Sequence, residues 1–223
     1  MSELAPLKIL NLYAGVGGNR KLWDGITING VIRELEITAV EMNPEVAAVY
    51  QKLYPNDTVI VGDAHDYLQK NYRDFDFIWA SPPCPTHSAM AKASRYKNKP
   101  YPDMKLYQEI IFLMNFFKGK FIIENVKPYY KPLVEPTGKA GRHQIWSNCL
   151  PMGVENMIVI PEKIQGGIMS HATLKGKAAL HEWLDIHFEE TIYIGTNDPA
   201  KILRNCVHPK LGLQLLEIAL NHP

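Results

Sequence analysis

The segment LKILNLYAGVGGN, residues 7–19, decides the fold class of this chain. Its apolar run Leu7–Leu12 predicts a buried strand, which leads into a turn with three glycines. The apolar pair Leu22-Trp23 then predicts the start of a helix. Strand, glycine turn and helix open an α/β unit, because glycines allow close backbone approach and a helix amino end favours a polar or anionic group. A tight turn that binds nothing explains this segment equally well.

Composition limits the class of protein. The chain has 223 residues and a formal net charge of +1, so it predicts one large domain, or one domain with a small appendage, without a bulk basic field. Its three cysteines, at positions 84, 149 and 206, form no CxxC pair, which argues against structural zinc and favours a reducing compartment. Neither a signal-peptide pattern nor an apolar stretch of about 18 residues is present. We therefore expect a soluble cytoplasmic protein.

The next two strands each end near a carboxylate. Residues 37–40 predict a strand ended by Glu41, and residues 58–61 predict one followed by Asp63. A carboxylate at the tip of the second strand can accept the ribose hydroxyls of a nucleoside, and Asp63 can accept from an adenine amino group. With no G-x-x-x-x-G-K-[ST] and no full G-x-G-x-x-G, the pattern favours S-adenosylmethionine over a nucleoside triphosphate or a dinucleotide.

The fourth strand carries the chemistry. The stretch DFIWASPPCP, residues 76–85, predicts a strand that the prolines end, which leaves Cys84 at the carboxyl edge of the sheet. In isolation a buried, inert cysteine is the simpler interpretation. The fifth strand, residues 120–123, delivers Glu124 and Asn125 to the same edge, so Glu124 should neighbour Cys84 in space.

An irregular basic loop follows the cysteine. Loops as long as 85–102 are usually functional or disordered, and its lysines and tyrosines suit phosphates and unstacked bases; a plain solvated loop is the alternative. The predicted DNA contacts are Ser88, Lys92, Arg95, Lys97 and Lys99. Asp103 should cap the next helix and Gly119 should end it.

The remaining elements complete an α/β fold with a mostly parallel sheet and helices on both faces. A sixth strand is expected at 143–146, a helix at 178–188 and a buried C-terminal helix from about residue 211. We divide the chain into a catalytic and cofactor-binding core, residues 1–150, a small insertion, 151–200, and a returning helical segment, 201–223.

Several motifs in order resemble those of DNA (cytosine-5)-methyltransferases. They are Tyr13-Ala14-Gly15-Val16-Gly17-Gly18, Glu41, Asp63, Pro82-Pro83-Cys84, Glu124-Asn125-Val126 and Asn205-Cys206-Val207. Because proline follows the cysteine, the chain looks like the short phage-type members. The resemblance covers residues 7–149 and about 204–220. It implies the Rossmann-like S-adenosylmethionine-dependent methyltransferase fold, with residues 151–200 as a reduced target-recognition segment.

The resemblance also implies roles. Cys84 would add to a cytosine flipped out of double-stranded DNA, and Glu124 would stabilise the protonated adduct, for which burial has to raise its pKa. The implied catalytic residues are Cys84, Glu124, Asn125, Arg142 and Gln144. The implied S-adenosylmethionine contacts are Tyr13, Ala14, Gly15, Val16, Gly17, Gly18, Glu41, Met42, Asp63, Ala64, Pro83, Leu106, Asn205 and Val207, with no metal.

The chain departs from the family pattern at three places. Gln144 stands where a second arginine is usual, Arg204 stands where a glycine is usual, and only about fifty residues are left for target recognition. Either recognition is loose or a second protein chain supplies part of it. Alternatives are RNA as the substrate, an amino-methyltransferase reading of Ser81-Pro82-Pro83, which needs an aromatic residue at position 84, and a DNA-binding subunit without turnover.

Overall fold

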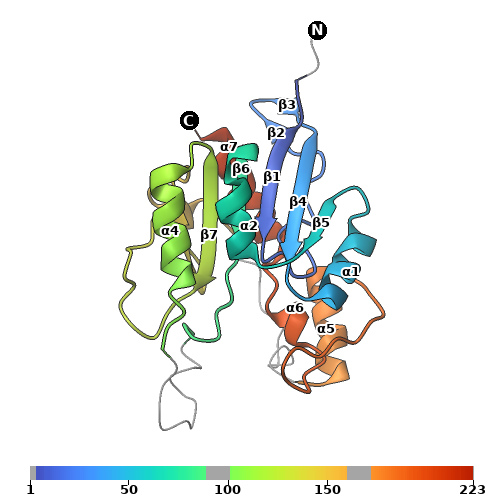
Figure 1. Ribbon diagram of the computed structural model, residues 1–223. Coiled ribbons are helices and arrows are strands. Elements are labelled where there is room, and N and C mark those ends of the chain that lie inside the picture. The colour runs from blue at the N-terminus through green and yellow to red at the C-terminus, as the bar shows by residue number, and fades with distance from the viewer. Residues whose placement is uncertain (1–3, 89–100, 160–171, 223) are drawn as a thin grey trace.

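The structure is a computed structural model that describes residues 4–88, 101–159 and 172–222. A seven-stranded sheet in the order β5-β4-β1-β6-β7-β9-β8 forms its centre (Figure 1). The strands are β1 Leu7–Leu12, β4 Leu35–Glu41, β5 Thr58–Val61, β6 Phe77–Ala80, β7 Lys120–Val126, β8 Gly138–Ala140 and β9 His143–Ser147. The first five strands in this order are parallel, and β9 runs antiparallel to both β7 and β8. The predicted fold class is confirmed.

Helices cover both faces of the sheet because its strands are apolar on both sides. In β1, Ile9 packs into the cluster that contains α7, while Leu10 packs into the cluster that contains α2 and α4. Figure 1 shows α2 and α4 in front of the sheet and α7 behind it. The helices are α1 Pro44–Leu53, α2 Ala64–Asn71, α4 Lys105–Phe116, α5 Leu174–Leu184, α6 Lys201–Arg204 and α7 Pro209–Asn221. The short elements are β2 Thr27–Ile28, β3 Val31–Ile32, and the 3₁₀ turns η1 Tyr72–Asp74 and η2 Val154–Asn156.

Two helices begin at capping residues that follow strand ends. The Asn43 side chain accepts hydrogen bonds from the N–H groups of Glu45 and Val46, with Pro44 at the first helical position of α1. Asp63 caps α2 in the same way. Both caps therefore fix how the chain leaves the carboxyl edge of the sheet.

The prediction that a helix begins at Leu22-Trp23 is wrong. The chain instead makes consecutive turns over residues 15–25, in which the N–H groups of Arg20 and Lys21 both donate to the Gly17 carbonyl. Trp23 is fully buried against Trp79, so it serves the core without belonging to a helix. Positive φ angles at glycines within this stretch are incompatible with a continuous helix.

Other expected boundaries shift. Met104, and not Asp103, is the N-cap of α4, although the Asp103 carboxylate accepts from the Lys105 N–H at 3.0 Å; the helix ends at Phe116, before Gly119. The helix expected at 178–188 is α5, which begins earlier because Thr173 caps it through the Gly176 N–H.

The segment that carries α5 packs on the core. Leu180 and Leu184 of α5 lie in one cluster with Val46 and Val49 of α1 and with Val16 of the glycine turn. Figure 1 shows α5 and α6 beyond the carboxyl end of the sheet, beside α1. No helix within the described ranges is long and apolar enough to cross a bilayer.

Candidate active site

The expected site residues gather at the carboxyl edge of the sheet. Because β4, β1, β6 and β7 are parallel and adjacent, the residues that follow them share one edge. Glu41 ends β4, Tyr13 follows β1, Cys84 follows β6 and Glu124 lies near the end of β7. Strand pairing therefore brings together residues that are 111 positions apart in the sequence.

A cavity of about 120 Å³ lies at this edge. Five of the predicted cofactor-binding residues line it: Tyr13, Met42, Asp63, Pro83 and Leu106. Its other lining residues are Pro82, His87, Asp103 and Lys105. The Lys105 ammonium group lies 3.0 Å from the Asp63 carboxylate, and the hydrogen bond between them lowers the pKa of Asp63. This cavity has the polar and apolar walls that an adenosine-containing cofactor needs.

The glycine turn is hydrogen-bonded to the Glu41 side chain. The Glu41 carboxylate accepts from the N–H groups of Gly15 and Asn43, at 3.0 and 2.9 Å, one on each oxygen. Each oxygen keeps a lone pair that can accept from a ribose hydroxyl. Gly15 has a φ of +55°, and a Cβ placed on it would meet no atom within 4 Å, so a ligand can approach the backbone there.

Gly17 and Gly18 serve the protein's own packing. A Cβ on Gly17 would lie 2.3 Å from Cε2 of Tyr54, and a Cβ on Gly18 would lie 2.4 Å from the Val207 carbonyl oxygen. The turn is therefore wedged between α1 and the segment before α7. Sequence reasoning assigned all three glycines to the cofactor, but the structure supplies a packing reason for two of them.

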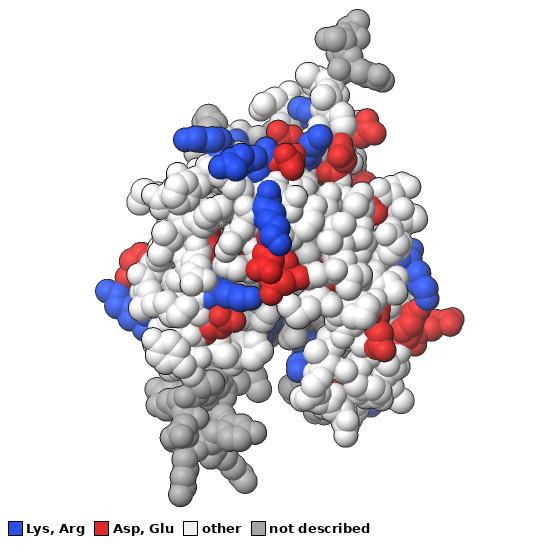
Figure 2. Space-filling view, in the orientation of Figure 1, with Lys and Arg blue, Asp and Glu red and all other residues white. Residues whose placement is uncertain are grey.

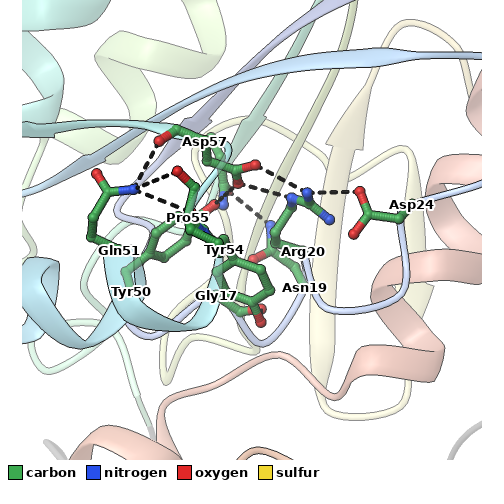
Figure 3. Close-up of polar contacts among 10 residues, drawn as sticks. Gly17, Asn19, Arg20, Asp24, Tyr50, Gln51, Tyr54, Pro55 and Asp57 are labelled. Atoms are coloured by element: carbon green, nitrogen blue, oxygen red, sulfur yellow. Dashed lines mark hydrogen bonds and ion pairs between the residues drawn. The ribbon is translucent and has the colours of Figure 1, made fainter.

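A buried ion pair anchors the far side of this turn (Figure 3). The Arg20 guanidinium forms a two-pronged pair with Asp57, at 2.9 and 3.0 Å, and both side chains are at most 5% exposed. The Tyr50 hydroxyl donates to the same carboxylate at 2.8 Å, and the Tyr54 hydroxyl donates to the Gly17 carbonyl oxygen at 2.8 Å. Hydrogen bonding and charge outweigh burial and raise the pKa of Arg20, so the guanidinium stays charged. Neither member of this pair was predicted from the sequence.

The remaining predicted cofactor contacts divide into two groups. Ala14, Val16, Ala64 and Val207 are buried, and Val16 packs in the cluster of α1 and α5. Asn205 is exposed at the end of α6. None of the five lines the cavity described above.

Cys84 is a partly buried thiol between opposing charges. Burial, and then the Glu124 carboxylate, raise the pKa of this thiol, while the Arg142 guanidinium lowers it. The Asn125 amide donates to the Pro82 carbonyl at 2.9 Å and so braces the loop that carries the cysteine. The thiol is therefore close enough to Glu124 and Arg142 for both charges to act on its pKa.

Glu124 has a partner that sequence reasoning missed. The Nδ1 of His143 lies 2.5 Å from Oε2 of Glu124, and Arg142 Nε donates to His143 Nε2 at 3.2 Å. Nε2 is thus an acceptor, which leaves the proton on Nδ1, pointing at Glu124. Burial favours a higher pKa for Glu124, but His143, Ser81 and Arg142 together outweigh it and lower that pKa. The expected raised pKa at Glu124 is therefore wrong for this state of the protein.

Gln144 lies away from this cluster. Side chains alternate along a strand, so Gln144 points to the sheet face opposite to that of His143. It is buried, and within the described structure its Oε1 has no hydrogen-bond partner. The position that contacts Glu124 is thus His143, and its signal in the sequence was a titratable residue next to Arg142 at the start of the predicted strand.

The predicted DNA contacts are largely untested. Lys92, Arg95, Lys97 and Lys99 lie outside the described residues. Ser88 is described, and its N–H donates to the Cys84 carbonyl at 3.0 Å. On the face in Figure 2, lysines and arginines are interspersed with acidic residues among the atoms that are described. Over that same part of the chain, no group of three or more His, Cys, Asp or Glu residues is placed to hold a metal ion.

The sheet order, the glycine turn and the carboxylates at the strand ends define a Rossmann-like methyltransferase fold. The chain belongs to the C-5 cytosine-specific DNA methylase family, whose family model matches residues 7–137, more than half of the chain. It is accordingly an S-adenosylmethionine-dependent DNA cytosine methyltransferase by family. No curated protein sequence matches the chain.

Solved structures resemble the chain only remotely. A hypothetical protein from Thermus thermophilus has a TM-score of 0.40 and 16% identity, over 63% of this chain and 73% of its own. A putative methyltransferase from Escherichia coli has a TM-score of 0.38 and 15% identity, over 63% and 74%. A methyltransferase from Agrobacterium tumefaciens described as SAM-dependent has a TM-score of 0.39 and 15% identity, over 58% and 41%. The family assignment rests on the match to the family model.

Proposed function

We propose that this protein methylates carbon 5 of cytosine in double-stranded DNA through a covalent adduct with Cys84. The observation that carries the proposal is that the adjacent parallel strands β6 and β7 bring Cys84 and Glu124 to the same edge of the sheet, where Pro82 and Pro83, just before Cys84, line the cavity together with four further residues that we expect to bind the cofactor. A cysteine with only a packing role would not require a carboxylate and a guanidinium that both act on its thiol.

In this proposal S-adenosylmethionine binds in the cavity and along the glycine turn beside it. Glu41 holds the ribose, Asp63 holds the adenine amino group, and Tyr13 and Gly15 flank the methionine part. The free lone pairs on Glu41 and the open space above Gly15 support these roles. When bound, the cofactor supplies a methyl group made electrophilic by its sulfonium.

Cys84 and Glu124 exchange a proton in the first step. The thiol is protonated in the resting protein because its pKa is raised, and Glu124 is ionised because its pKa is lowered. As Sγ bonds to carbon 6, Glu124 takes the thiol proton and places it on ring nitrogen 3, which receives the electron pair displaced around the ring. Carbon 5 becomes nucleophilic as a result. After methylation, a water molecule takes the carbon-5 proton, and the electron pair of the broken C5–H bond forms the C5=C6 bond as the Sγ–C6 bond breaks. The departing thiolate regains its proton from ring nitrogen 3 through Glu124, which returns both side chains to their starting states.

The target base has to leave the duplex to reach Cys84. We assign closure over the base to the loop 85–102 and target recognition to residues 151–200, with a second protein chain as the other source of recognition. Within the described part of the second segment, Leu180 and Leu184 of α5 pack in one cluster with Val46 and Val49 of α1.

Covalent trapping tests the proposal. Duplexes that contain 5-fluorocytosine are incubated with the protein and S-adenosylmethionine, and the products are denatured and separated by mass. Fluorine blocks the final elimination, so a denaturation-resistant adduct that maps to Cys84 is expected. Cys84→Ala should form no adduct. The matched control is Cys149→Ala, at a buried cysteine near the start of β7, which should still form the adduct.

The same assay separates the alternatives. An adduct on single-stranded RNA but not on DNA would replace DNA with RNA as the substrate. Methyl transfer to an exocyclic amino group without an adduct would favour the amino-methyltransferase reading. Cofactor binding with neither transfer nor adduct would leave a non-catalytic DNA-binding subunit.

A further inference from the structure

A buried hydrogen-bonded cluster around Glu109 lies next to the cavity, and Glu109 itself has no role in the chemistry above. Glu109 of α4 is completely buried, and its Oε1 accepts from the Tyr13 hydroxyl and from Nδ1 of His65, the latter at 2.9 Å. The Gln69 amide donates to Nε2 of His65 at 2.7 Å, which leaves the imidazole proton on Nδ1. Glu109 is therefore an acceptor at the centre of a fixed chain of donors.

The second oxygen of the Glu109 carboxyl group differs from the first in its hydrogen bonding. Oε2 of Glu109 is buried and has no hydrogen-bond partner among the described residues. An ionised carboxylate with a bare oxygen is costly in such a place, whereas a proton on Oε2 makes the group neutral. Burial raises the pKa of Glu109 against the Tyr13 and His65 hydrogen bonds, in agreement with a neutral carboxyl group.

The cluster belongs to the wall of the cavity. Tyr13 lines the cavity on one side and bonds Glu109 on the other, and it has a φ of +56°, which is rare for a residue with a side chain. Leu106 lines the cavity one turn before Glu109 on α4. A single tyrosine side chain thus separates the carboxyl group from the space where the methionine part of the cofactor is proposed to lie.

We propose that Glu109 determines the specificity of this cavity for the charged sulfonium cofactor over its neutral product. With the cation bound, Glu109 releases the proton from Oε2 to solvent and becomes the buried counter-charge. With S-adenosylhomocysteine bound, it keeps the proton. This inference rests on the proposed function, because it needs the cofactor in this cavity.

Besides His65, whose Nδ1 lies 2.9 Å from Oε1 of Glu109, further titratable groups act on Tyr13 or Glu109. Tyr13 holds its proton, since burial and then Glu109 itself raise its pKa. Asp63, the N-cap of α2, is already paired with Lys105, and Asp103 acts on Tyr13 from the segment before α4. At an effective dielectric constant near 20, a counter-charge one ring away changes an affinity by about tenfold.

Calorimetry on the full chain tests the proposal. S-adenosylmethionine and S-adenosylhomocysteine are titrated at pH 7 in phosphate and in Tris, whose different ionisation enthalpies report the protons released. More protons should be released with S-adenosylmethionine than with S-adenosylhomocysteine. In Glu109→Gln this difference should vanish, and the ratio of the two dissociation constants should shift by about tenfold towards the product.

The ratio of the two dissociation constants distinguishes a specific effect of Glu109 from general damage to the cavity. The two ligands share the adenosine and amino-acid parts, so a merely distorted cavity would weaken both equally. Glu217→Gln, at an exposed residue of α7, is the matched control and should change neither quantity. Equal proton release by both ligands, or a difference that persists in Glu109→Gln, would overturn the role of Glu109 alone. Failure of both ligands to bind the unaltered chain would overturn the proposed function together with it.

Discussion

Replacing Asp57 by Asn should cost about 3–5 kcal/mol of unfolding free energy, because it leaves the Arg20 guanidinium buried without its partner. Asp57 accepts two hydrogen bonds from Arg20 and one from Tyr50, and its side chain is only 4% exposed. Asp24 also contacts Arg20 at 2.8 Å, but its side chain is 75% exposed and solvent screens it. It therefore cannot replace Asp57. The cost is a large part of the roughly 5–15 kcal/mol that stabilises a typical domain.

Urea unfolding followed by tryptophan fluorescence measures this cost. With a urea slope of about 2–3 kcal/mol/M, the midpoint should fall by about 1–2.5 M. Asp24→Asn is the matched control and should change the unfolding free energy by less than about 1 kcal/mol. The double variant Arg20→Met with Asp57→Leu should recover most of the loss, because it removes both buried charges. An Asp57→Asn cost below 1 kcal/mol, or an equal cost for Asp24→Asn, would refute the reasoning.

Three further predictions concern the glycine turn and the cysteine. Gly17→Ala should destabilise the fold by at least about 2 kcal/mol more than Gly15→Ala in the same urea assay. Both glycines have a positive φ, but only at Gly17 would the added Cβ clash with tyrosine rings. Gly15→Ala should instead weaken cofactor binding in calorimetry, and equal unfolding costs for the two variants would contradict this. Glu124→Gln should lower the pKa of the Cys84 thiol, because the Glu124 carboxylate raises it. The pH profile of alkylation by iodoacetamide should therefore move to lower pH. An unchanged profile would mean that the Glu124 charge does not act on the thiol. His143→Ala should raise the pKa of Glu124, because the effect of burial is then opposed only by Ser81 and Arg142. His143→Asn keeps an N–H donor and should therefore raise the pKa of Glu124 less than His143→Ala does. A ¹³C titration of the Glu124 carboxyl group, assigned with Glu124→Gln, measures the pKa in both variants.

Local signals in the sequence predicted much of the fold correctly. The five parallel strands, the Asn43-Pro44 start of α1 and the presence of the C-terminal helix follow from short apolar runs and caps. These features are predictable because each depends on a few consecutive residues. The grouping of Cys84 and Glu124 at one edge was predictable too, because parallel strands place their ends together.

The errors occurred where distant contacts overrule local preference. Leu22 and Trp23 have a helix-like pattern, but the Gly17 turn and the burial of Trp23 against Trp79 hold them in turns. The early start of α5 depends on the Thr173 cap, which the weak helix propensity of Gly176 concealed.

The sequence by itself therefore determined the five parallel strands and the strand β9, and it predicted that Glu41, Cys84 and Glu124 follow or end these strands. The strand β8 and the order of the strands in the sheet were not predicted. Only the tertiary structure decided the charge states at the carboxyl edge of the sheet. The pKa of Glu124 depends on the His143 ring that β9 brings next to it, and the raised pKa of Glu109 depends on its burial. Desolvation and cross-element hydrogen bonds depend on neighbours far apart in the chain, so no local pattern contains them.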